Sequence, residues 1–451
     1  MRPNIEDLNK EITDLIRDRK YAEIKNILPF HPEDIAELIR NLAVPYHKVL
    51  VFRLVPYDRA IDVFEYLPRE EEENMLKTLS SQEIRDILNE MSPDGRTELL
   101  EEMPAEVVKK FLNMLSPDER KIALEILNYP PESVGRLITP DFVQLYEDMT
   151  ARDALTHIRN VGIKKETVYH CYVLDKTKRL RGIVSLKNLV LNRPDKTISE
   201  IMYRDVIAVG AFTDKEEAAN IFKRYDLMVL PIVDNNDKLL GIVTFDDLVD
   251  VLEDEATEDF ERIAAVLPVD KPYMKANFFE LIWKRSFWLI VLVILESLSS
   301  LVIKNYGGVM RQWIALTFFL PVLIATGGNA GMQSAMMIIR GLTTNDVNVK
   351  DFFKVVFRES LLGIAIGVIL AAVGLMRVII QESGEWMLSL SVGVAMGCTV
   401  MFAAILGAAL PIIFRKLRLD PALMSGPLIT TIVDVVGIFI YFEIASLLLG
   451  L

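Results

Sequence analysis

The sequence is poor in the residues that build disulfide frameworks, zinc sites and most hydrolytic active sites. Its 451 residues include two cysteines, Cys171 and Cys398, which lie in different regions, and four histidines. Two such distant cysteines argue against a disulfide framework, and thiolate and imidazole donors are too few for a zinc or copper site. No H-E-x-x-H motif and no paired nucleophile and base occur, so we do not expect an enzyme.

Two further motifs are missing, and the charge is one-sided. No G-x-x-x-x-G-K-[ST] loop occurs, which argues against a P-loop ATPase. The opening residues, MRPNIEDLNKEITDLIRD, do not have the pattern of a secretory signal. The chain carries 63 Asp and Glu against 50 Lys and Arg, a net charge of −13. An acidic surface disfavours nucleic acid as a partner and favours cations.

Apolar residues and charge divide the chain near Lys284. From there on it has 12 basic and 9 acidic residues, against 38 and 54 before it. The later part contains five long apolar stretches, at Phe287–Ile303, Trp313–Ile339, Val355–Ile380, Met387–Phe414 and Ala422–Gly450. Each approaches or exceeds the ~20 residues that cross a bilayer. The sequence therefore predicts an α-helical transmembrane domain of five helices over 283–451.

Basic residues in the loops predict the orientation of these helices. They precede the first stretch and recur between the second and third and between the fourth and fifth, as Lys284, Arg285, Arg340, Lys350, Lys354, Arg358, Arg415, Lys416 and Arg418. The positive-inside rule places these loops in the cytoplasm. The acidic N-terminal domains are then cytoplasmic as well.

Acidic residues inside the apolar stretches are the candidate ion ligands. Asp434 lies in LITTIVDVVGIFIYF, where a carboxylate costs about 2.5–3.5 kcal/mol to insert and no Lys, Arg or His follows to neutralise it. We expect Asp434 to bind the ion. Glu296, in LVILESLSS, fits either an ion site or a hydrogen bond, and Glu443 fits an interfacial or structural role.

The second stretch is interrupted by Pro321 and by the segment TGGNAGMQS, and Ser425-Gly426-Pro427 opens the fifth. We expect broken backbone that lines a cavity, with close helix packing through small residues as the alternative. The polar donors near these breaks are oxygens, which Mg2+ prefers, and Mg2+ is often held through its hydration shell by one or two carboxylates. Composition alone does not separate Mg2+ from Ca2+, Mn2+ or Co2+.

Residues 1–132 predict an all-α superhelical domain, because apolar residues recur every 12 positions. One such series is Val55, Leu67, Leu79, Met91, Met103, Leu115 and Leu127, with Pro, Ser or Asn after each. Short helices with one apolar face, each opened by a Ser or Pro start signal, stack as a solenoid. Such a stack usually provides an interaction surface.

Residues 133–197 and 198–258 form a duplication. VLDKTKRLRGIVSLKNL repeats as VDNNDKLLGIVTFDDL, with Asp175 matching Asp234 and Gly182 matching Gly241. Each copy predicts helix, strand, turn, strand, helix, an α/β unit. The pair resembles tandem cystathionine-β-synthase (CBS) domains, a regulatory module that often binds adenine nucleotides. The resemblance implies ribose contacts at Thr244 and Asp247, where the first copy has Ser185 and Asn188.

Nine acids crowd Asp246–Glu261, and 259–282 is expected to form a connecting (plug) helix that leads to the membrane. Asp247, Asp250, Asp254, Glu258 and Glu261 share one helical face, where like charges repel. A solvated face is the ordinary interpretation. The position between the CBS pair and the first span favours regulation by divalent cations that neutralise these acids.

The order of parts, with PVLIATGGNAGMQS and the Asp434 helix, closely resembles the MgtE family of magnesium channels. The resemblance implies a homodimer in a bacterial-type plasma membrane, passive Mg2+ uptake, and closure when Mg2+ binds the cytoplasmic domains. It assigns the pore carboxylate to Asp434 and the regulatory Mg2+ ligands to Asp214, Glu216, Asp226, Asp247, Asp250, Glu255, Glu258, Asp259, Asp62, Asp94 and Glu98. Met332 and Gly426 depart from the family, which can carry Asn at both positions.

Two alternatives remain at this stage. A transporter of Co2+ or Mn2+ would have the same architecture. A pore-less nucleotide sensor at the membrane would also carry the CBS pair, although the unneutralised Asp434 and the polar second stretch argue against it.

Overall fold

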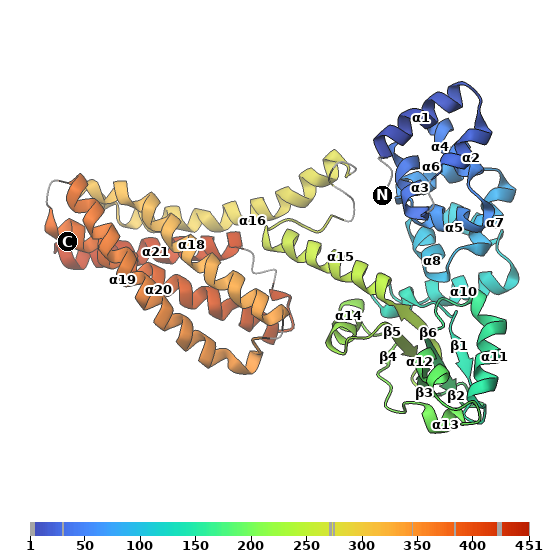
Figure 1. Ribbon diagram of the computed structural model, residues 1–451. Coiled ribbons are helices and arrows are strands. Elements are labelled where there is room, and N and C mark those ends of the chain that lie inside the picture. The colour runs from blue at the N-terminus through green and yellow to red at the C-terminus, as the bar shows by residue number, and fades with distance from the viewer. Residues whose placement is uncertain are drawn as a thin grey trace. The chain divides into compact units, whose positions relative to one another are not determined.

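A computed structural model describes residues 5–28, 31–269, 273, 276–344, 346–382, 385–421 and 426–450. The chain divides into two compact units, Met1–Leu252 (unit 1) and Glu253–Leu451 (unit 2), which are described separately. Figure 1 gives the labels of the helices and strands. Unit 1 contains a stack of helices followed by two small sheets, and unit 2 contains long apolar helices.

The N-terminal part of unit 1 is a stack of short helices. They are α1 (Ile5–Arg17), α2 (Tyr21–Ile27), α3 (Pro32–Asn41), α4 (Pro45–Leu54), α5 (Tyr57–Glu65), α6 (Arg69–Thr78), α7 (Ser81–Glu90), α8 (Pro93–Glu102), α9 (Ala105–Leu112) and α10 (Pro117–Leu127). From α4 to α10 each helix begins 12 residues after the one before it, which confirms the period seen in the sequence. Proline at the first turn or serine at the N-cap starts most of them, as at Ser80, Ser92 and Ser116.

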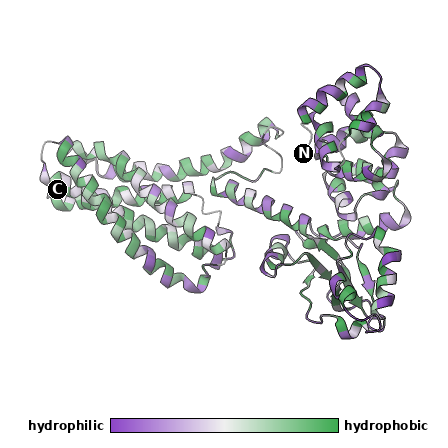
Figure 2. Ribbon diagram, viewed as in Figure 1, coloured by the Kyte–Doolittle hydropathy of each residue, from purple (hydrophilic) through white to green (hydrophobic). Residues whose placement is uncertain are grey.

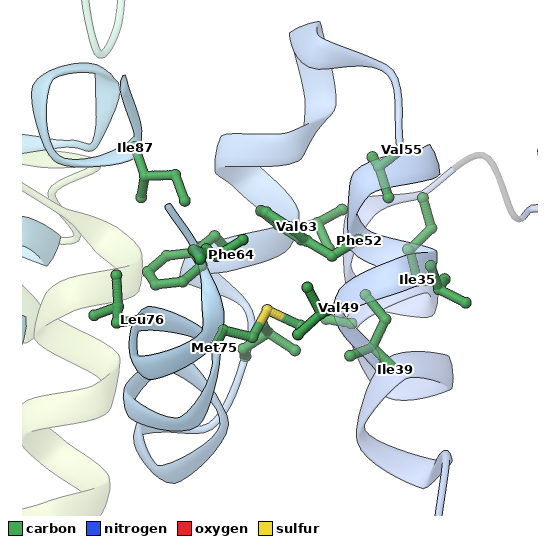
Figure 3. Packing of buried hydrophobic residues seen from close by; sticks show 14 of the residues in the cluster. Ile35, Ile39, Val49, Phe52, Val55, Val63, Phe64, Met75, Leu76 and Ile87 are labelled. Atoms are coloured by element: carbon green, nitrogen blue, oxygen red, sulfur yellow. The ribbon is translucent and has the colours of Figure 1, made fainter. Parts of the chain in front are cut away.

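The apolar residues of the repeat form one continuous core (Figure 3). Phe52 and Phe64, one repeat apart, pack edge-on with ring centroids 6.1 Å apart. Met75 and Ile87, from the next two repeats, are also buried in this core. Each short helix is marginal alone, so the stack depends on burying these faces against one another.

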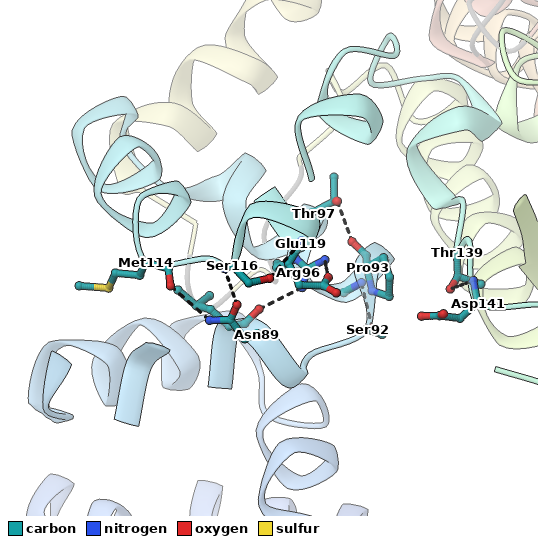
Figure 4. Close-up of polar contacts among 12 residues, drawn as sticks. Asn89, Ser92, Pro93, Arg96, Thr97, Met114, Ser116, Glu119, Thr139 and Asp141 are labelled. Carbon is teal, nitrogen blue, oxygen red and sulfur yellow. Dashed lines mark hydrogen bonds and ion pairs between the residues drawn. The ribbon is translucent and has the colours of Figure 1, made fainter. Parts of the chain in front are cut away.

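A polar contact set ties α7, α8 and α10 together within this stack (Figure 4). Arg96 is fully buried, donates to the carbonyl of Leu88 at 3.1 Å, and pairs with Glu119. Asn89 accepts from the Ser116 amide at 2.7 Å, so the end of α7 holds the start of α10. A buried guanidinium needs such partners because its charge cannot be left unsatisfied.

The rest of unit 1 is the duplicated α/β pair. Its elements are η1 (Val134–Leu137), β1 (Val143–Leu145), α11 (Ala151–Val161), η2 (Gly162–Lys164), β2 (His170–Leu174), β3 (Leu180–Ser185), α12 (Leu186–Leu191), α13 (Ile198–Ile201), β4 (Val209–Gly210), α14 (Lys215–Arg224), β5 (Val229–Val233) and β6 (Leu239–Thr244). The sheets have the orders β1-β2-β3 and β4-β5-β6, in each of which the first strand is parallel to the second and the second antiparallel to the third. The expected hairpins are confirmed. The short strands β1 and β4 were not expected, because three and two residues leave no periodic signal.

The residues that match between the two copies have the same structural role in each copy. Asp175 and Asp234 each accept backbone amides of the following turn, from Thr177 at 2.7 Å and from Asn236 at 2.7 Å. Gly182 and Gly241 leave room for a crossing backbone. A Cβ at Gly241 would lie 2.5 Å from the Thr139 carbonyl oxygen, and one at Gly182 would lie 2.8 Å from that of Tyr203. In each copy, the segment ahead of the first strand thereby bridges to the last strand of the other copy.

Helix α15 (Phe245–Ile263) follows β6 without a break and carries the acidic run. The helical residues therefore end at Ile263, and the next helix, α16, begins at Phe278. Residues 270–272, 274 and 275, inside the segment expected to form the connecting helix, lie outside the described residues.

Among the residues described, five helices of unit 2 are long and apolar enough to cross a membrane, at Phe278–Asn305, Ala315–Thr343, Val349–Gln381, Trp386–Lys416 and Gly426–Leu449. They correspond to α16 (Phe278–Asn305), α18 (Ala315–Thr343), η3 (Val349–Asp351) with α19 (Phe352–Gln381), α20 (Trp386–Lys416) and α21 (Gly426–Leu449). The short α17 (Gly307–Gln312) joins α16 to α18. Figure 2 shows that most residues along these helices are hydrophobic. The count of five expected from the sequence is confirmed.

The expected break in the second span is wrong. Helix α18 is continuous from Ala315 to Thr343, with Pro321 inside it, so TGGNAGMQS is helical. Its glycines serve close packing: a Cβ at Gly327 would lie 2.8 Å from Thr399 Cγ2, and one at Gly331 would lie 3.2 Å from Ile429 Cγ2. The alternative of small residues at helix contacts therefore holds here. At the fifth span α21 begins at Gly426, and Ser425 lies outside the described residues.

Replacing Arg96 with leucine is expected to destabilise the helical stack. The substitution removes the bond to the Leu88 carbonyl and the pair with Glu119, at a cost of about 2–4 kcal/mol in the free energy of unfolding. Arg53→Leu, which breaks an exposed pair with Glu83, is the control and should cost under about 1 kcal/mol. Urea unfolding of residues 1–263, followed by circular dichroism, measures both. Equal losses in the two variants would contradict the role assigned to Arg96.

Candidate divalent-cation sites

Acidic residues gather in a cleft of unit 1 with a volume of about 930 Å³. Its acidic lining residues come from the helical stack and from the CBS pair, and comprise Asp62, Glu65, Glu90, Asp94, Glu98, Asp141, Glu166, Asp246 and Asp247. The basic residues Arg69, Lys164 and Lys165 also line it. The cleft brings together four of the acids predicted as Mg2+ ligands, namely Asp62, Asp94, Glu98 and Asp247.

The start of α8 positions the acids on the helical side. Ser92 caps α8 and accepts from the Gly95 amide at 3.2 Å, which places Asp94 in the first turn. Glu65, at the end of α5, accepts from the Ser92 amide at 2.7 Å. Two repeats that are three apart in the chain, α5 and α8, therefore contribute one carboxylate each to the same corner of the cleft.

The start of α15 positions the acids on the CBS side. Thr244, the last residue of β6, donates from its hydroxyl to Asp247 Oδ2 at 2.7 Å, and its amide reaches the same oxygen at 3.2 Å. The two residues predicted as ribose contacts are thus bonded to each other as the cap of α15. Nearby, Glu166 donates its amide to the Asp141 carbonyl at 2.8 Å, and Lys165 pairs with the Asp141 carboxylate at 2.9 Å.

The acids of the cleft resist ionisation. Burial raises the pKa of Asp94 to about 7, and the charges of Glu166, Glu65 and Asp246 add to the shift. Burial first, and Asp94 second, raise the pKa of Asp247 to about 7. The Glu166 residue is exposed to solvent at the cleft, yet loss of hydration followed by the charges of Asp246 and Asp247 raises the pKa of its carboxyl to about 7 as well. Such a set of carboxylates attracts a cation.

Basic side chains already hold some of the predicted ligands. Arg69 pairs with Glu98 and, at 2.7 Å, with the buried Glu72. Asp62 lies exposed on the wall of the cleft. Asp94 and Asp247 are therefore the predicted ligands whose charges most directly oppose each other.

The acids predicted in the second CBS copy lie at the two ends of α14. Asp214 caps this helix and accepts from the Glu216 amide at 2.9 Å. Asp226 follows its end with a φ of 49°, which an aspartate tolerates better than most residues. The side chains of Asp214, Glu216 and Asp226 are all exposed. Asp214 and Asp226 each have a local structural role, as the cap of α14 and as the left-handed residue after it.

The remaining regulatory candidates lie along α15, where Asp250 is exposed and Glu255, Glu258 and Asp259 are half-buried. Glu258 pairs with Arg262 one turn later. Within the part of the chain that is described, no group of three or more His, Cys, Asp or Glu comes together closely enough to hold a metal ion.

Asp434 lies on α21 beside the glycines of α18. A Cβ at Gly328 would lie 3.1 Å from Thr430 Cγ2 and 3.8 Å from Asp434 Oδ1, so the missing side chain leaves room for the carboxylate. Asp434 is half-buried, and among the described residues its buried Oδ1 has no hydrogen-bond partner. Glu296 of α16 is exposed and lies within electrostatic reach of Asp434. A second carboxylate nearby makes a cation at Asp434 more favourable.

The two departures from the family pattern touch each other. A Cβ at Gly426 would lie 2.7 Å from the Met332 sulfur and 3.1 Å from Met332 Cγ. The Met332 side chain fills the space that a larger residue at 426 would occupy. Met332 and Gly426 are therefore in contact, and a larger residue at 426 would require the Met332 side chain to move.

Other site residues were missed from the sequence. Glu65, Asp141, Glu166 and Asp246 line the cleft, yet the resemblance did not assign them; the spacing of one helical turn from Asp62 to Glu65 was the available signal. In unit 2, Ser334 of α18 donates to Glu359 of α19 at 2.8 Å, and Tyr306 donates to Glu443. The structural role expected for Glu443 is consistent with that bond.

Comparison with known proteins gives the family. Residues 30–132 match the MgtE intracellular N domain, residues 134–194 and 198–254 match CBS domains, and residues 320–444 match the MgtE divalent cation transporter domain. The magnesium transporter MgtE of Thermus thermophilus is 36% identical over 448 residues, covering 98% of this chain and 99% of that protein. This chain belongs to the MgtE family of magnesium transporters. The MgtE of Bacillus subtilis is 31% identical over 446 residues, covering 98% of this chain and 97% of that protein.

Solved structures of the MgtE family agree with the fold of unit 1. The soluble part of a magnesium transporter superposes with a TM-score of 0.53 at 28% identity, over 56% of this chain and 100% of that one. The cytosolic domain of the Mg2+ channel MgtE in complex with ATP superposes with a TM-score of 0.50 at 33% identity, over 54% and 99%. The chain is therefore a membrane transporter with soluble domains ahead of its spans, and its family is not one of enzymes.

The stability of the soluble part should fall as the pH rises. Asp94, Glu166 and Asp247 have a pKa near 7 when folded and about 4 when unfolded, so between these values the folded state binds more protons and stability decreases with pH. In EDTA, residues 1–263 should melt at a higher temperature at about pH 6 than at about pH 8.

The double variant Asp94→Asn, Glu166→Gln should lose much of this difference, because the amides carry no charge to bury. The control is Asp14→Asn with Asp18→Asn, a pair of exposed acids on and beside α1, which should leave the difference unchanged. A wild-type melting temperature that rises from about pH 6 to about pH 8 would contradict the assignment of the cleft as a strained acidic cluster.

Proposed function

We propose that the chain mediates passive Mg2+ uptake across a bacterial-type plasma membrane and that Mg2+ bound to its cytoplasmic domains closes it. The observation that carries this proposal is Asp434, an unneutralised carboxylate on an apolar helix, with room beside Gly328 and no hydrogen-bond partner for Oδ1 among the described residues. Nothing in its own helix offers a positive charge. A carboxylate is retained at such a place when a cation stabilises it.

The donors suit a hydrated ion. Mg2+ loses water reluctantly and binds through one or two carboxylates while keeping several waters. Asp434, with Glu296 nearby, and the hydroxyl-bearing Thr430 provide oxygen donors of this kind. The same oxygen donors would also bind Co2+ or Mn2+, so the flux experiment below includes both as competing ions.

The cleft of unit 1 fits the regulatory ion. The charge of Asp94 raises the pKa of Asp247, and the charge of Asp247 raises the pKa of Glu166, so bringing these acids together is unfavourable unless a cation lies between them. Burial removes water from these two carboxylates, and a Mg2+ ion that carries its own waters can hydrogen-bond to them in its place. We infer that these two carboxylates hold a hydrated Mg2+, and that Asp62 and Glu98 line its approach.

Closure then follows from linkage. Mg2+ binds better to the conformation in which the acids are close and shifts the population toward it. Changing a gate from 1:99 to 99:1 takes about 5.5 kcal/mol of differential binding. Several weak sites together can supply this, which gives Asp214, Glu216, Asp226, Asp250, Glu255, Glu258 and Asp259 a role beside the cleft.

The assembly follows from the same reasoning. One Asp434 in each chain of a homodimer would give two carboxylates along a shared pore in the lipid bilayer. The basic loops before α16 and after α18 and α20 orient the soluble domains toward the cytoplasm.

ATP is a second candidate ligand, supported by the family structure that contains it. Thr244 and Asp247 would contact its ribose, although the bond between them at 2.7 Å must first adjust. Because Asp247 also lies in the acidic cleft, ATP and Mg2+ would influence each other there.

Asp434→Ala is expected to abolish Mg2+ flux. The variant removes the carboxylate that would bind the hydrated ion, while the glycines of α18 that pack against α21 are unchanged. The measurement is Mg2+ entry into liposomes that contain the purified protein, with Co2+ and Mn2+ as competing ions. Glu443→Gln is the matched control, because Glu443 lies on the same helix as Asp434 but accepts from Tyr306 at the end of α16, so this variant should leave flux intact. Equal flux in Asp434→Ala and wild type would remove Asp434 as the ion site.

Neutralising the regulatory acids should leave the protein open at high Mg2+. The triple variant Asp247→Asn, Asp250→Asn, Glu258→Gln lacks the charges that bind Mg2+ in the closed conformation, so flux should persist where the wild type closes. The control neutralises three exposed acids of the helical stack, Asp14, Asp18 and Glu37. Closure of the triple variant at the wild-type concentration would contradict the sensor role of these acids.

A further inference from the structure

The end of α15 is fastened to the start of α16 within unit 2. Ala265 takes a left-handed conformation with a φ of 56°, and the Val266 amide donates to the Glu261 carbonyl at 2.9 Å, which terminates the helix. The chain then returns along α15, where the Val269 amide donates to the Glu261 carboxylate at 2.8 Å. The Leu267 amide donates to the Lys284 carbonyl of α16 at 3.2 Å. The position of this end of α15 is thus determined by specific contacts.

Arg262 lies in this fastened end and pairs with two acids at once. One arm of its guanidinium reaches Glu258, one turn earlier on α15, and the other reaches Asp420, in the segment between α20 and α21. Asp259 also contributes to the field around Arg262. The side chains are 31%, 31% and 27% exposed for Arg262, Glu258 and Asp420, so these charges interact in a partly dry environment.

A guanidinium is suited to such a double contact because its planar fork donates in two directions at a fixed geometry. The positive charge of Arg262 also repels any other cation that approaches the same carboxylates. A divalent ion that approaches Glu258 meets a positive charge already bonded to the same carboxylate, and repulsion at this distance is substantial where water is scarce. The ion must displace Arg262 or bind more weakly beside it.

We propose that Arg262 is a built-in competitor for Glu258 and that it sets the divalent-cation concentration at which α15 responds. This inference rests on the proposed closure by Mg2+ at the acids of α15. Arg262 acts as a positioning residue through Glu258. Asp420 weakens the hold of Arg262 on Glu258 because it pairs with the same guanidinium. The response of α15 to the divalent cation is thereby connected to the segment that leads into the Asp434 helix.

The two halves of the contact should give shifts of opposite sign. Arg262→Gln removes the competitor, so half-maximal closure should occur at a several-fold lower Mg2+ concentration. Asp420→Asn leaves the guanidinium to Glu258 alone, so half-maximal closure should require a higher concentration. If the contact between Arg262 and Asp420 were only a structural bridge, the two variants would break the same bridge and shift the midpoint in the same direction.

The test is Mg2+ flux into liposomes carrying the full chain, with the internal Mg2+ varied. Flux at low internal Mg2+ equal to the wild type verifies that each variant is folded, and Arg311→Gln, an exposed arginine of α17, is the matched control with no shift expected. A double-mutant cycle with Glu258→Gln adds a second readout. The Arg262→Gln shift should vanish in the Glu258→Gln background, because the contested carboxylate is gone.

The outcomes separate this inference from the function on which it rests. Shifts of opposite sign that depend on Glu258 support it. Shifts of the same sign, or an Arg262→Gln shift that persists without Glu258, overturn it and leave closure by Mg2+ standing. If Arg262→Gln does not insert, Asp420→Asn alone decides, since a lower midpoint in that variant overturns the inference. A wild type whose flux ignores internal Mg2+ overturns both proposals.

Discussion

Removing carboxylates from water without a full set of basic partners is the constraint on which this structure depends. Asp94, Glu166 and Asp247 bear that cost in the cleft of unit 1, where burial is the largest cause of their raised pKa values. Asp434 bears it on an apolar helix. Natural folds keep such costs where a ligand offsets them, and the ligand that offsets a carboxylate is a cation.

The helices around these acids are arranged to leave space for ions. In unit 1 the end of α5 lies against the start of α8, so Glu65 and Asp94 meet through the Ser92 cap. In unit 2 the glycines of α18 let α20 and α21 pack closely, and Gly328 lies opposite Thr430 and Asp434. The same small residues therefore serve helix packing beside the proposed ion site, and no break in the helix is needed.

Basic residues are used sparingly and at defined positions. Arg69 forms ion pairs with both Glu72 and Glu98, and Lys165 pairs with Asp141. Arg262 pairs with both Glu258 and Asp420. Each lies beside acids proposed to respond to Mg2+. Such internal cations weaken the attraction of nearby carboxylates for a divalent ion, and in the proposed mechanism they would raise the Mg2+ concentration at which these acids respond.

The sequence by itself determined the repeat of short helices, the duplicated hairpins, the five apolar spans and the isolation of Asp434, because each depends on local periodicity or on composition within one segment. Only the tertiary structure decided that TGGNAGMQS is helical, since a glycine tolerated at a helix contact and a glycine that breaks a helix look alike until the partner, here Thr399, is known. The tertiary structure also brought Glu166 beside Asp94 and Asp247, and Arg262 beside Asp420. These residues are far apart in the chain, and no spacing rule relates them. Their proximity results from how whole elements pack, which is the physical reason that the acidic cleft and the Arg262 contact could not be predicted from the sequence.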